Sequence, residues 1–533
     1  MSAPITSSST AYTVFNGYLD MSGKGSEAVA PIIAELPQNI SLTSLNLEDS
    51  QLGIEGATSL AGALAQNSRL INLNLRNNGL GIEGVASLAQ MFVQNSSLAN
   101  LNLRGNGLSK ECTVSVVPVL TQHSSLTNLN LGFNHLGDEG ADSLAQLLTQ
   151  NTSLTNLVLS CNRLGLNGAG SLALALTQNT SLIDLDLAHN LLGANGVASL
   201  ARALTVNSSL TSLDLGGNQL DVEGVASLVQ MLTQNSSLTN LNLECNHLGA
   251  PGAAALAQAF TVNSGLTSIN LGSNSLGNGG AAALALALTQ NSGLTNLDLN
   301  FNLLGAEDAA SLAQALIQNS SLTNLELSFN QLGDEGAAAL AGALTTNSSL
   351  TSLNLRGNPL GAEGAVPLAR ALTHNASLTA LDLRYNQLGF ASANALVLAL
   401  TQNSSLMSLN LGGNPFGDES TSQLEGIESH LERNRHNEAS RRLPLEALYA
   451  RHFARLVFES YSPGNKSAVY SQIWNHSGRP MGLQFGENNV YTVDWSLFLR
   501  SVADAGFDLQ KGVELFLQDA GVGPHYAYHV TLI

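Results

Sequence analysis

The sequence predicts an α/β solenoid, a right-handed array of short parallel strands that are each followed by a helix. Three observations predict it: a strict repeat period, an alternating apolar and polar stretch in the first half of each unit, and a helical apolar stripe in the second half. Composition agrees, because the 533-residue chain is 44% hydrophobic but only 5% aromatic and 11% charged. That profile is typical of a small unit repeated many times.

The period is carried by leucines that follow a serine or glycine. They recur at one constant spacing, that between Leu42 and Leu70, without insertion as far as Leu406, which gives fourteen units. Each unit follows the pattern L-x-x-L-x-L-x-x-N-x-L-G. Within one unit, Leu129 and Leu131 alternate with polar residues. An alternation of period two predicts a strand with one buried face.

The second half of a unit has the spacing of a helix. Ala141, Leu144, Ala145 and Leu148 fall at positions i, i+3, i+4 and i+7, which lie on one helical face. Because each crossover is a helix, neighbouring strands must pair in parallel. Helices are wider than strands, so stacked units should bend with the strands on the inner wall.

An asparagine recurs where each strand turns towards its helix, from Asn78 to Asn414. Its amide donates and accepts at once, so we expect it to satisfy buried backbone groups of the bend. Ser50 takes this place in the first unit, as expected of a terminal copy. Asn-x-Ser/Thr triplets, such as those at Asn95 and Asn151, are interpreted as polar turns at helix ends and not as glycan sites.

Units of this length, with a full helix and an N-x-L-G-x-x-G turn, resemble the ribonuclease-inhibitor class of leucine-rich repeats. That class includes the Ran GTPase-activating protein and the repeat domains of NOD-like receptors. The resemblance covers roughly residues 13–435 and implies a horseshoe that binds partners with its concave wall and ascending loops. The near-identical units, and the absence of secretory features, also resemble repeat effectors of intracellular bacteria.

Composition shifts give the expected domains. Residues 1–40 should form an N-terminal cap, a degenerate repeat with a helix near residues 26–36, and residues 41–417 should hold the fourteen repeats. Residues 418–442 should form an amphipathic capping helix and a charged linker. From residue 443 to 533 the period is lost and aromatic residues increase, which predicts a small α+β module with a hairpin around Gly486.

Charge and cysteine content limit the partners and the compartment. The formal net charge is −19, and residues 1–420 hold 10 basic and 27 acidic residues. Such a field disfavours nucleic acid and favours a partner protein with a basic surface. Cys112, Cys161 and Cys245 give no disulfide framework. With no signal-peptide core and no run long enough to span a membrane, we expect a cytoplasmic chain, in the host cytoplasm if it is an effector.

No motif for catalysis is found. The sequence has no phosphate-binding G-x-x-x-x-G-K-[ST], no H-E-x-x-H and no C-x-x-C. His525 and His529 lie four apart on a predicted strand, which keeps them well separated. We therefore expect no cofactor, no metal and no enzyme activity from the repeats, while the role of residues 443–533 stays open.

The variable residues of the inner wall are the candidate binding residues. Between and just after the strand leucines most residues are Asn, Ser, Gly or Asp, so large or basic side chains stand out. Arginine and aromatic residues are enriched in binding hot spots, and exposed phenylalanine usually indicates a partner. The alternative is random drift on a neutral wall. The N-terminal cluster comprises Arg76, Arg104, Phe133, His135 and Arg163. The C-terminal cluster comprises Phe301, Glu326, Phe329, Arg356, Arg384 and Tyr385, and an acidic stretch of Asp184, Asp186, Asp214 and Glu244 lies between the two.

These observations favour a protein-binding scaffold with its site on the concave face. Two alternatives stay open. One is a regulator of a small GTPase, as the resemblance to the Ran activator implies, although no catalytic motif can be matched residue by residue. The other is a substrate-recruiting repeat fused to an active or targeting C-terminal domain, as in a secreted effector.

Overall fold

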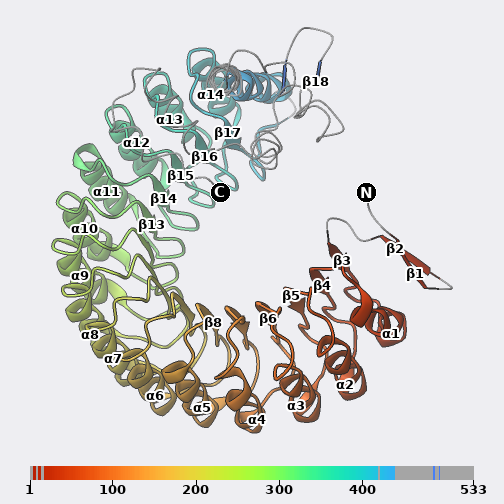
Figure 1. Ribbon diagram of the computed structural model, residues 1–533. Helices are drawn as coiled ribbons and strands as arrows, with labels where there is room; N and C mark the ends of the chain where they lie inside the picture. Colours follow the sequence, from red (N-terminus) through yellow and green to blue (C-terminus); the bar gives the residue numbers. More distant parts are fainter. Residues whose placement is uncertain are drawn as a thin grey trace, which may run out of the picture. The chain divides into compact units, whose positions relative to one another are not determined.

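The computed structural model describes residues 17–417 and 420–437, together with the backbone of four short strands nearer the two ends. The chain divides into two compact units, Met1–Glu428 and Ser429–Ile533. The predicted α/β solenoid is confirmed within the first unit, where helices line the outer side of a curved sheet (Figure 1).

Apart from an antiparallel pair near its N-terminus, the strands of the first unit form one parallel sheet, which is fifteen-stranded within the described residues and follows the order of the sequence. From β4 onwards, each strand pairs with the next at an offset of one whole repeat, so that Leu129 faces Leu157. The strands are β3 (Tyr18–Asp20), β4 (Ser44–Asn46), β5 (Asn72–Asn74), β6 (Asn100–Asn102), β7 (Asn128–Asn130), β8 (Asn156–Val158), β9 (Asp184–Asp186), β10 (Ser212–Asp214), β11 (Asn240–Asn242), β12 (Ser268–Asn270), β13 (Asn296–Asp298), β14 (Asn324–Glu326), β15 (Ser352–Asn354), β16 (Ala380–Asp382) and β17 (Ser408–Asn410).

A helix follows each strand from β3 to β16. Each packs with the apolar stripe predicted from the sequence turned inwards, since Ala141, Leu144 and Leu148 are all buried. The helices are α1 (Ser26–Glu35) with the 3-10 turn η1 (Leu36–Gln38), α2 (Gly53–Leu64), α3 (Gly81–Met91), α4 (Lys110–Leu120), α5 (Gly137–Gln150), α6 (Leu166–Leu176), α7 (Gly193–Leu204), α8 (Val222–Leu232), α9 (Gly249–Phe260), α10 (Gly277–Leu288), α11 (Ala306–Gln318), α12 (Gly333–Leu344), α13 (Ala365–Leu372) and α14 (Phe390–Leu400).

Glycine is required at the two positions of the N-x-L-G-x-x-G turn for different reasons. Gly137 has a φ of +60°, a backbone conformation that side chains other than glycine adopt with strain. Gly140 sits against the preceding leucine, because a Cβ at this position would lie 2.8 Å from the Cβ of Leu136. The first glycine therefore allows the turn, and the second allows the helix to close onto it.

The recurring asparagine satisfies the bend as expected. In Asn134, Nδ2 donates to the carbonyl oxygens of Leu131 and Leu103, at 2.8 and 3.2 Å. Its Oδ1 accepts from the backbone N–H groups of Asn106 and Leu108, at 3.0 and 2.9 Å. The prediction of a structural role is confirmed, and each asparagine also links its own unit to the one before it.

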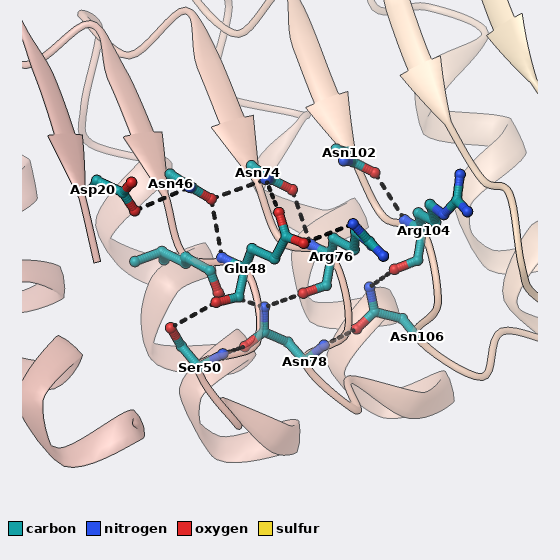
Figure 2. A network of polar contacts seen from close by, with 11 residues as sticks. Asp20, Asn46, Glu48, Ser50, Asn74, Arg76, Asn78, Asn102, Arg104 and Asn106 are labelled. Carbon is teal, nitrogen blue, oxygen red and sulfur yellow. Dashed lines mark hydrogen bonds and ion pairs between the residues drawn. The ribbon is translucent and has the colours of Figure 1, made fainter. Parts of the chain in front are cut away.

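Figure 2 shows the beginning of this row, where Ser50, Asn78 and Asn106 follow one another. Ser50 is buried, and its hydroxyl donates to the carbonyl oxygen of Met21 at 2.9 Å. A hydroxyl has a single proton to donate, so the serine makes fewer bonds than an asparagine would. That is sufficient at the end of the row, where no earlier full unit has to be linked.

A second row of asparagines joins the ends of the helices. Asn151 is only 5% exposed, its Nδ2 donates to the carbonyl oxygen of Leu120 at 2.9 Å, and its Oδ1 accepts from the N–H of Leu154 at 2.8 Å. Most of these asparagines begin an Asn-x-Ser/Thr triplet, and their burial supports the interpretation that they are structural. His123 takes the place in one unit: its Nε2 bonds the carbonyl oxygen of Asn95 at 2.8 Å, and its Nδ1 accepts from the N–H of Leu126 at 3.1 Å.

The sequence predicted the helices at both ends of the repeat array, but not all of the structure at its N-terminal end. The helix α1 lies where the first, degenerate unit predicts one, but an antiparallel pair, β1 (Pro4–Ser7) and β2 (Thr10–Thr13), was not predicted. Residues 421–437 are helical, and Ile427 and Leu431 are buried.

The predicted hairpin around Gly486 is confirmed by β18 (Gln484–Phe485), which pairs with the antiparallel strand β19 (Tyr491–Thr492). The other elements expected between residues 443 and 533 lie outside the described residues. The boundaries between the four predicted domains stay predictions.

Candidate partner-binding surface

Three columns of side chains border the strand face of the first unit. The strand column is the last residue of each strand, such as Asn130, and the exit column lies two residues later, at the position of Arg356. The turn column lies one residue after the exit column and has a positive φ. Its non-glycine members with that conformation are Asp49, Asn77, Phe133, Cys161, His189, Cys245, Ser273, Phe301, Phe329 and Tyr385.

The strand column is dictated by the scaffold more than the sequence pattern indicated. The side-chain oxygen of Asn130 accepts from the backbone N–H of Gly132 at 2.9 Å, and Asp186 bonds Ala188 in the same way at 2.8 Å. Asparagine and aspartate can both close this turn, which corrects the expectation that this position is among the freely variable residues of the inner wall. Part of the acidic stretch is therefore structural. Glu326 is an exception, since its longer side chain bonds Asn354 and Asn324 instead.

Turn-column side chains lean over the following unit. A Cβ at Gly357 would lie 2.7 Å from Cδ1 of Phe329, and a Cβ at Gly413 would lie 2.4 Å from Cε1 of Tyr385. His189 and Gly217 are related in the same way. A large residue in this column therefore lies flat where the next unit has glycine.

The N-terminal cluster is divided in the structure. Arg76 pairs with Glu48 at 2.8 Å (Figure 2), whereas the guanidinium carbon of Arg104 lies 3.9 Å from the ring centroid of Phe133, a ring that is 50% exposed. His135 and Arg163 are exposed, but they lie two residues beyond the turn column, on the loop towards the helix. The sequence grouped these five residues, but the contact found among them joins only Arg104 and Phe133.

The C-terminal cluster contains a continuous stack, which we call the aromatic row: Phe301, Phe329, Arg356 and Tyr385. The rings of Phe301 and Phe329 are stacked, with 4.4 Å between centroids and 12° between planes. The guanidinium carbon of Arg356 lies 4.9 Å from the centroids of both Phe329 and Tyr385. The two ends stay open to solvent, because Phe301 is 51% exposed and Tyr385 is 54% exposed.

Arg384 and Glu326, the other members of this cluster, lie outside the row. Arg384 donates from Nε and Nη2 to Oδ2 of Asp382, at 2.8 and 2.5 Å. Burial raises the pKa of Glu326, and the charge of Asp382 raises it further. Sequence reasoning missed Asp382 as the partner of Arg384.

Asp298 was missed as well, although it is the most perturbed carboxyl group of this wall. Burial raises the pKa of Asp298 to about 6, and the charges of Glu326 and Glu244 add to the rise, against a hydrogen bond from the backbone of Asn300 that lowers it. The strand pairing places Asp298 directly beside Glu326. Its signal in the sequence was an acidic residue in the strand column three residues before a phenylalanine of the turn column.

Another part of the strand face forms a hollow of about 480 Å³ over β3 to β9. It is lined by asparagine amides, and these bond to one another, with Nδ2 of Asn100 donating to Oδ1 of Asn72 at 2.6 Å. Because these polar groups are already paired, the hollow offers a ligand less than the aromatic row does.

The comparison with known families identifies the repeat. A model described as "Leucine Rich repeat" matches eleven segments of the chain, at residues 38–61, 122–145, 150–173, 178–201, 206–229, 234–257, 262–285, 318–341, 346–369, 374–396 and 402–420. The chain is a leucine-rich-repeat protein. No curated protein matches its sequence. Among solved structures it is similar to "Leiomodin-1 Actin-Binding Site 2 (ABS2)", with 17% identity over 37% of this chain and 96% of that chain, and a TM-score of 0.27.

The described part of this leucine-rich-repeat protein holds no group of three or more His, Cys, Asp or Glu side chains placed to bind a metal ion. Within the same residues, no helix has the length and apolar character required to cross a bilayer. All three cysteines are free, as the sequence predicted.

Proposed function

We propose that this leucine-rich-repeat protein is a non-enzymatic scaffold that binds a partner protein on its concave strand face. The single observation behind the proposal is the aromatic row, in which four side chains are in continuous contact while both end rings remain half exposed. The pair of Arg104 and Phe133 is proposed as a second contact area. Leucine-rich repeats generally serve as protein-binding scaffolds.

The physical case rests on apolar area and preorganisation. A half-exposed aromatic side chain leaves about 100 Å² for a partner to cover, worth about 2.5 kcal/mol per ring at about 25 cal/mol per Å². The rings are already held by their neighbours, so little side-chain entropy is lost when a partner binds. Arginine and aromatic side chains together are the usual composition of a binding hot spot.

The finer assignments belong to the same proposal and rest on the sequence. They are the ribonuclease-inhibitor type of repeat and a cytoplasmic location, while an origin as a secreted effector stays an alternative. Regulation of a small GTPase, or an activity of residues 443–533, stays a prediction from the sequence that no feature of the described residues favours.

The test is affinity purification of the full chain from a native or host lysate, with quantitative mass spectrometry of captured proteins. We expect Phe329→Ala and Arg356→Ala to remove the specific partners while the circular dichroism spectrum stays unchanged. Leu286→Ala and Arg370→Ala are the controls, because both side chains belong to helices and Leu286 is exposed. Capture that is unchanged in both wall variants contradicts the proposal.

A further inference from the structure

Phe301 is one end of the aromatic row, and only one face of its ring is covered by another ring. One face of Phe301 stacks on Phe329, and the guanidinium of Arg356 lies between the rings of Phe329 and Tyr385. On the other side of Phe301, the preceding turn-column residue is Ser273, whose side chain is too small to cover a ring. The open face of Phe301 is therefore available for one more stacking group.

Carboxylates without a basic partner lie in the same part of the wall as Phe301. Asp298 is three residues before Phe301, which limits the separation of their Cα atoms to about 10 Å. Glu326 is its neighbour on the paired strand, and the charge of Glu244 also acts on it. Within the described residues the ion pairs are Arg76 with Glu48, Lys110 with Glu139 and Arg384 with Asp382, so none of these three carboxylates has a basic partner.

Nearby groups reinforce the negative character of the position. The side chain of Asn300 directs its Nδ2 to Asp298 at 3.1 Å, and its buried Oδ1 has no donor among the described residues. The site thus presents acceptors and negative charge beside an exposed ring. A cation brought by a partner would gain both attraction to the carboxylates and contact with the ring face.

The protein itself shows which cation suits such a ring. It stacks a guanidinium on a turn-column ring at two places, Arg104 on Phe133 and Arg356 on Phe329 and Tyr385. A guanidinium is flat and carries five donors, so it can stack and bond a carboxylate at once, whereas a lysine ammonium is a compact and strongly hydrated charge. A divalent ion is a poorer match, because no group of three acidic side chains in the described part is placed to hold one.

We infer that an arginine side chain of the partner protein docks at this position, with its guanidinium on the open face of Phe301 and bonded to Asp298. Glu244 and Glu326 provide the surrounding negative field. This arginine site rests on the proposed function and adds to it the chemistry of one contact. It also explains why this wall keeps unpaired carboxylates beside an exposed ring, an arrangement that burial makes costly without a partner.

The test uses a fluorescein-labelled peptide with several arginines separated by Gly-Ser, and measures its affinity for the full chain by anisotropy at 0.15 M salt. Matched peptides replace arginine by citrulline, which is flat but neutral, or by lysine. We expect the arginine peptide to bind at least tenfold more tightly than the citrulline peptide and several-fold more tightly than the lysine peptide. Equal affinity of the arginine and lysine peptides, or no binding of the arginine peptide up to millimolar protein, overturns the inference.

Variants then locate the binding on the wall. Asp298→Asn and Phe301→Leu should each weaken the arginine peptide about tenfold. The matched control is Asp186→Asn, which removes a half-buried strand-column carboxylate four units away that closes the same backbone turn but is followed by His189 instead of a phenylalanine. It should change the affinity less than twofold. Equal losses in Asp298→Asn and Asp186→Asn would mean general attraction to an acidic protein and would overturn the arginine site.

The outcome is separable from that of the proposed function. If Phe329→Ala and Arg356→Ala remove the captured partners but Asp298→Asn and Phe301→Leu do not, the scaffold proposal stands and the arginine site falls. If the peptide binds through Asp298 but Phe329→Ala and Arg356→Ala leave partner capture unchanged, the proposed function falls instead. Circular dichroism of each variant shows whether it is folded.

Discussion

The guanidinium of Arg104 lies on the ring of Phe133, the turn-column residue of the following unit, with 3.9 Å between the guanidinium carbon and the ring centroid. Arg356 and Tyr385 have the same separation in sequence and are also in contact. Where the turn-column residue of the following unit is glycine, the arginine pairs with an acid instead. Arg76 pairs with Glu48, and the turn column of its following unit holds Gly105. Arg384 pairs with Asp382, and the turn column of its following unit holds Gly413.

The contact between Arg356 and Tyr385 should be measurable as an energetic coupling. In a double-mutant cycle with Arg356→Met and Tyr385→Leu, we expect a coupling of about 0.5–1 kcal/mol in the free energy of unfolding by urea. The control cycle pairs Arg104→Met with Tyr385→Leu, side chains ten units apart that should be independent. A coupling no larger than that of the control pair would contradict the cation–π contact.

Replacing Gly357 by alanine should disturb Phe329. Gly357 and Gly333 have φ values of +67° and +63°, so alanine is strained by about 1–2 kcal/mol at either position. Only at Gly357 does a new Cβ meet a ring, 2.7 Å from Cδ1 of Phe329, while nothing lies within 4 Å at Gly333. The free energy of unfolding, measured with urea, should therefore fall further for Gly357→Ala than for Gly333→Ala, by about 1–3 kcal/mol. Equal losses would show that Phe329 does not lie over Gly357.

The asparagine row should be costly to interrupt. Asn246→Ala removes hydrogen bonds to the carbonyl oxygens of Leu215 and Leu243 and from the N–H groups of Asn218 and Leu220. We expect a loss of about 3 kcal/mol in unfolding free energy, since these buried groups lose their partners. Asn240→Ala, at an exposed strand position, should change stability by less than about 0.5 kcal/mol. The comparison is made by urea unfolding followed by circular dichroism.

His123 should make the repeat array sensitive to acid. Burial lowers the pKa of His123, whose Nδ1 must stay unprotonated to accept from the N–H of Leu126. The stability that it contributes is present above the unfolded pKa of about 6.5 and is lost as the pH falls below it. His123→Asn restores the usual residue of the row and removes this dependence. As the pH is lowered from 7.5 to 5, the melting temperature of the wild type should therefore fall more than that of the variant. Parallel curves of melting temperature against pH would refute the idea.

Asp298 should act in the opposite direction. Because its pKa is raised to about 6, the folded state binds the proton more tightly than the unfolded state, and stability falls as the pH rises from about 4 to 6. Asp298→Asn should therefore be more stable than the wild type at pH 7, by about 1 kcal/mol after allowing for partial exposure. Thermal unfolding at pH 4 and pH 7 checks this. If Asp298→Asn is more stable than the wild type but binds the arginine peptide more weakly, the carboxylate of Asp298 serves binding and not stability.

The sequence predicted most of the scaffold, because a strict repeat period determines which residues are buried and how units are joined. It predicted the parallel strands, the helices and the role of residues such as Asn134. It did not predict that Asp186 and its equivalents close a backbone turn, since aspartate in an alternating pattern looks like a free surface residue. The pair β1 and β2 lies outside the period and gave no comparable signal.

The candidate site was predicted only as a list of residues. Sequence patterns place Phe301, Phe329, Arg356 and Tyr385 on one wall, but the stack depends on a positive φ in the turn column, which makes each side chain lean along the array. That conformation is rare outside glycine, and nothing in the composition of the unit indicates it. Glu326 and Arg384 were grouped with the row because only their position, and not the direction of their side chains, could be inferred.

Because each turn-column side chain lies over the following unit, the contacts of this column depend on the order of the units. Excision of residues 329–356 would join the unit of Phe301 directly to that of Gly357, so that Phe301 would cover the same bare backbone that Phe329 covers now. Excision of residues 357–384 would instead bring Phe329 under Tyr385, ring upon ring as in the present Phe301 pair. A gene that gains or loses whole repeat-length segments can therefore change the spacing of its rings and arginines in single steps, without altering the leucine core, and so acquire new binding preferences by recombination alone.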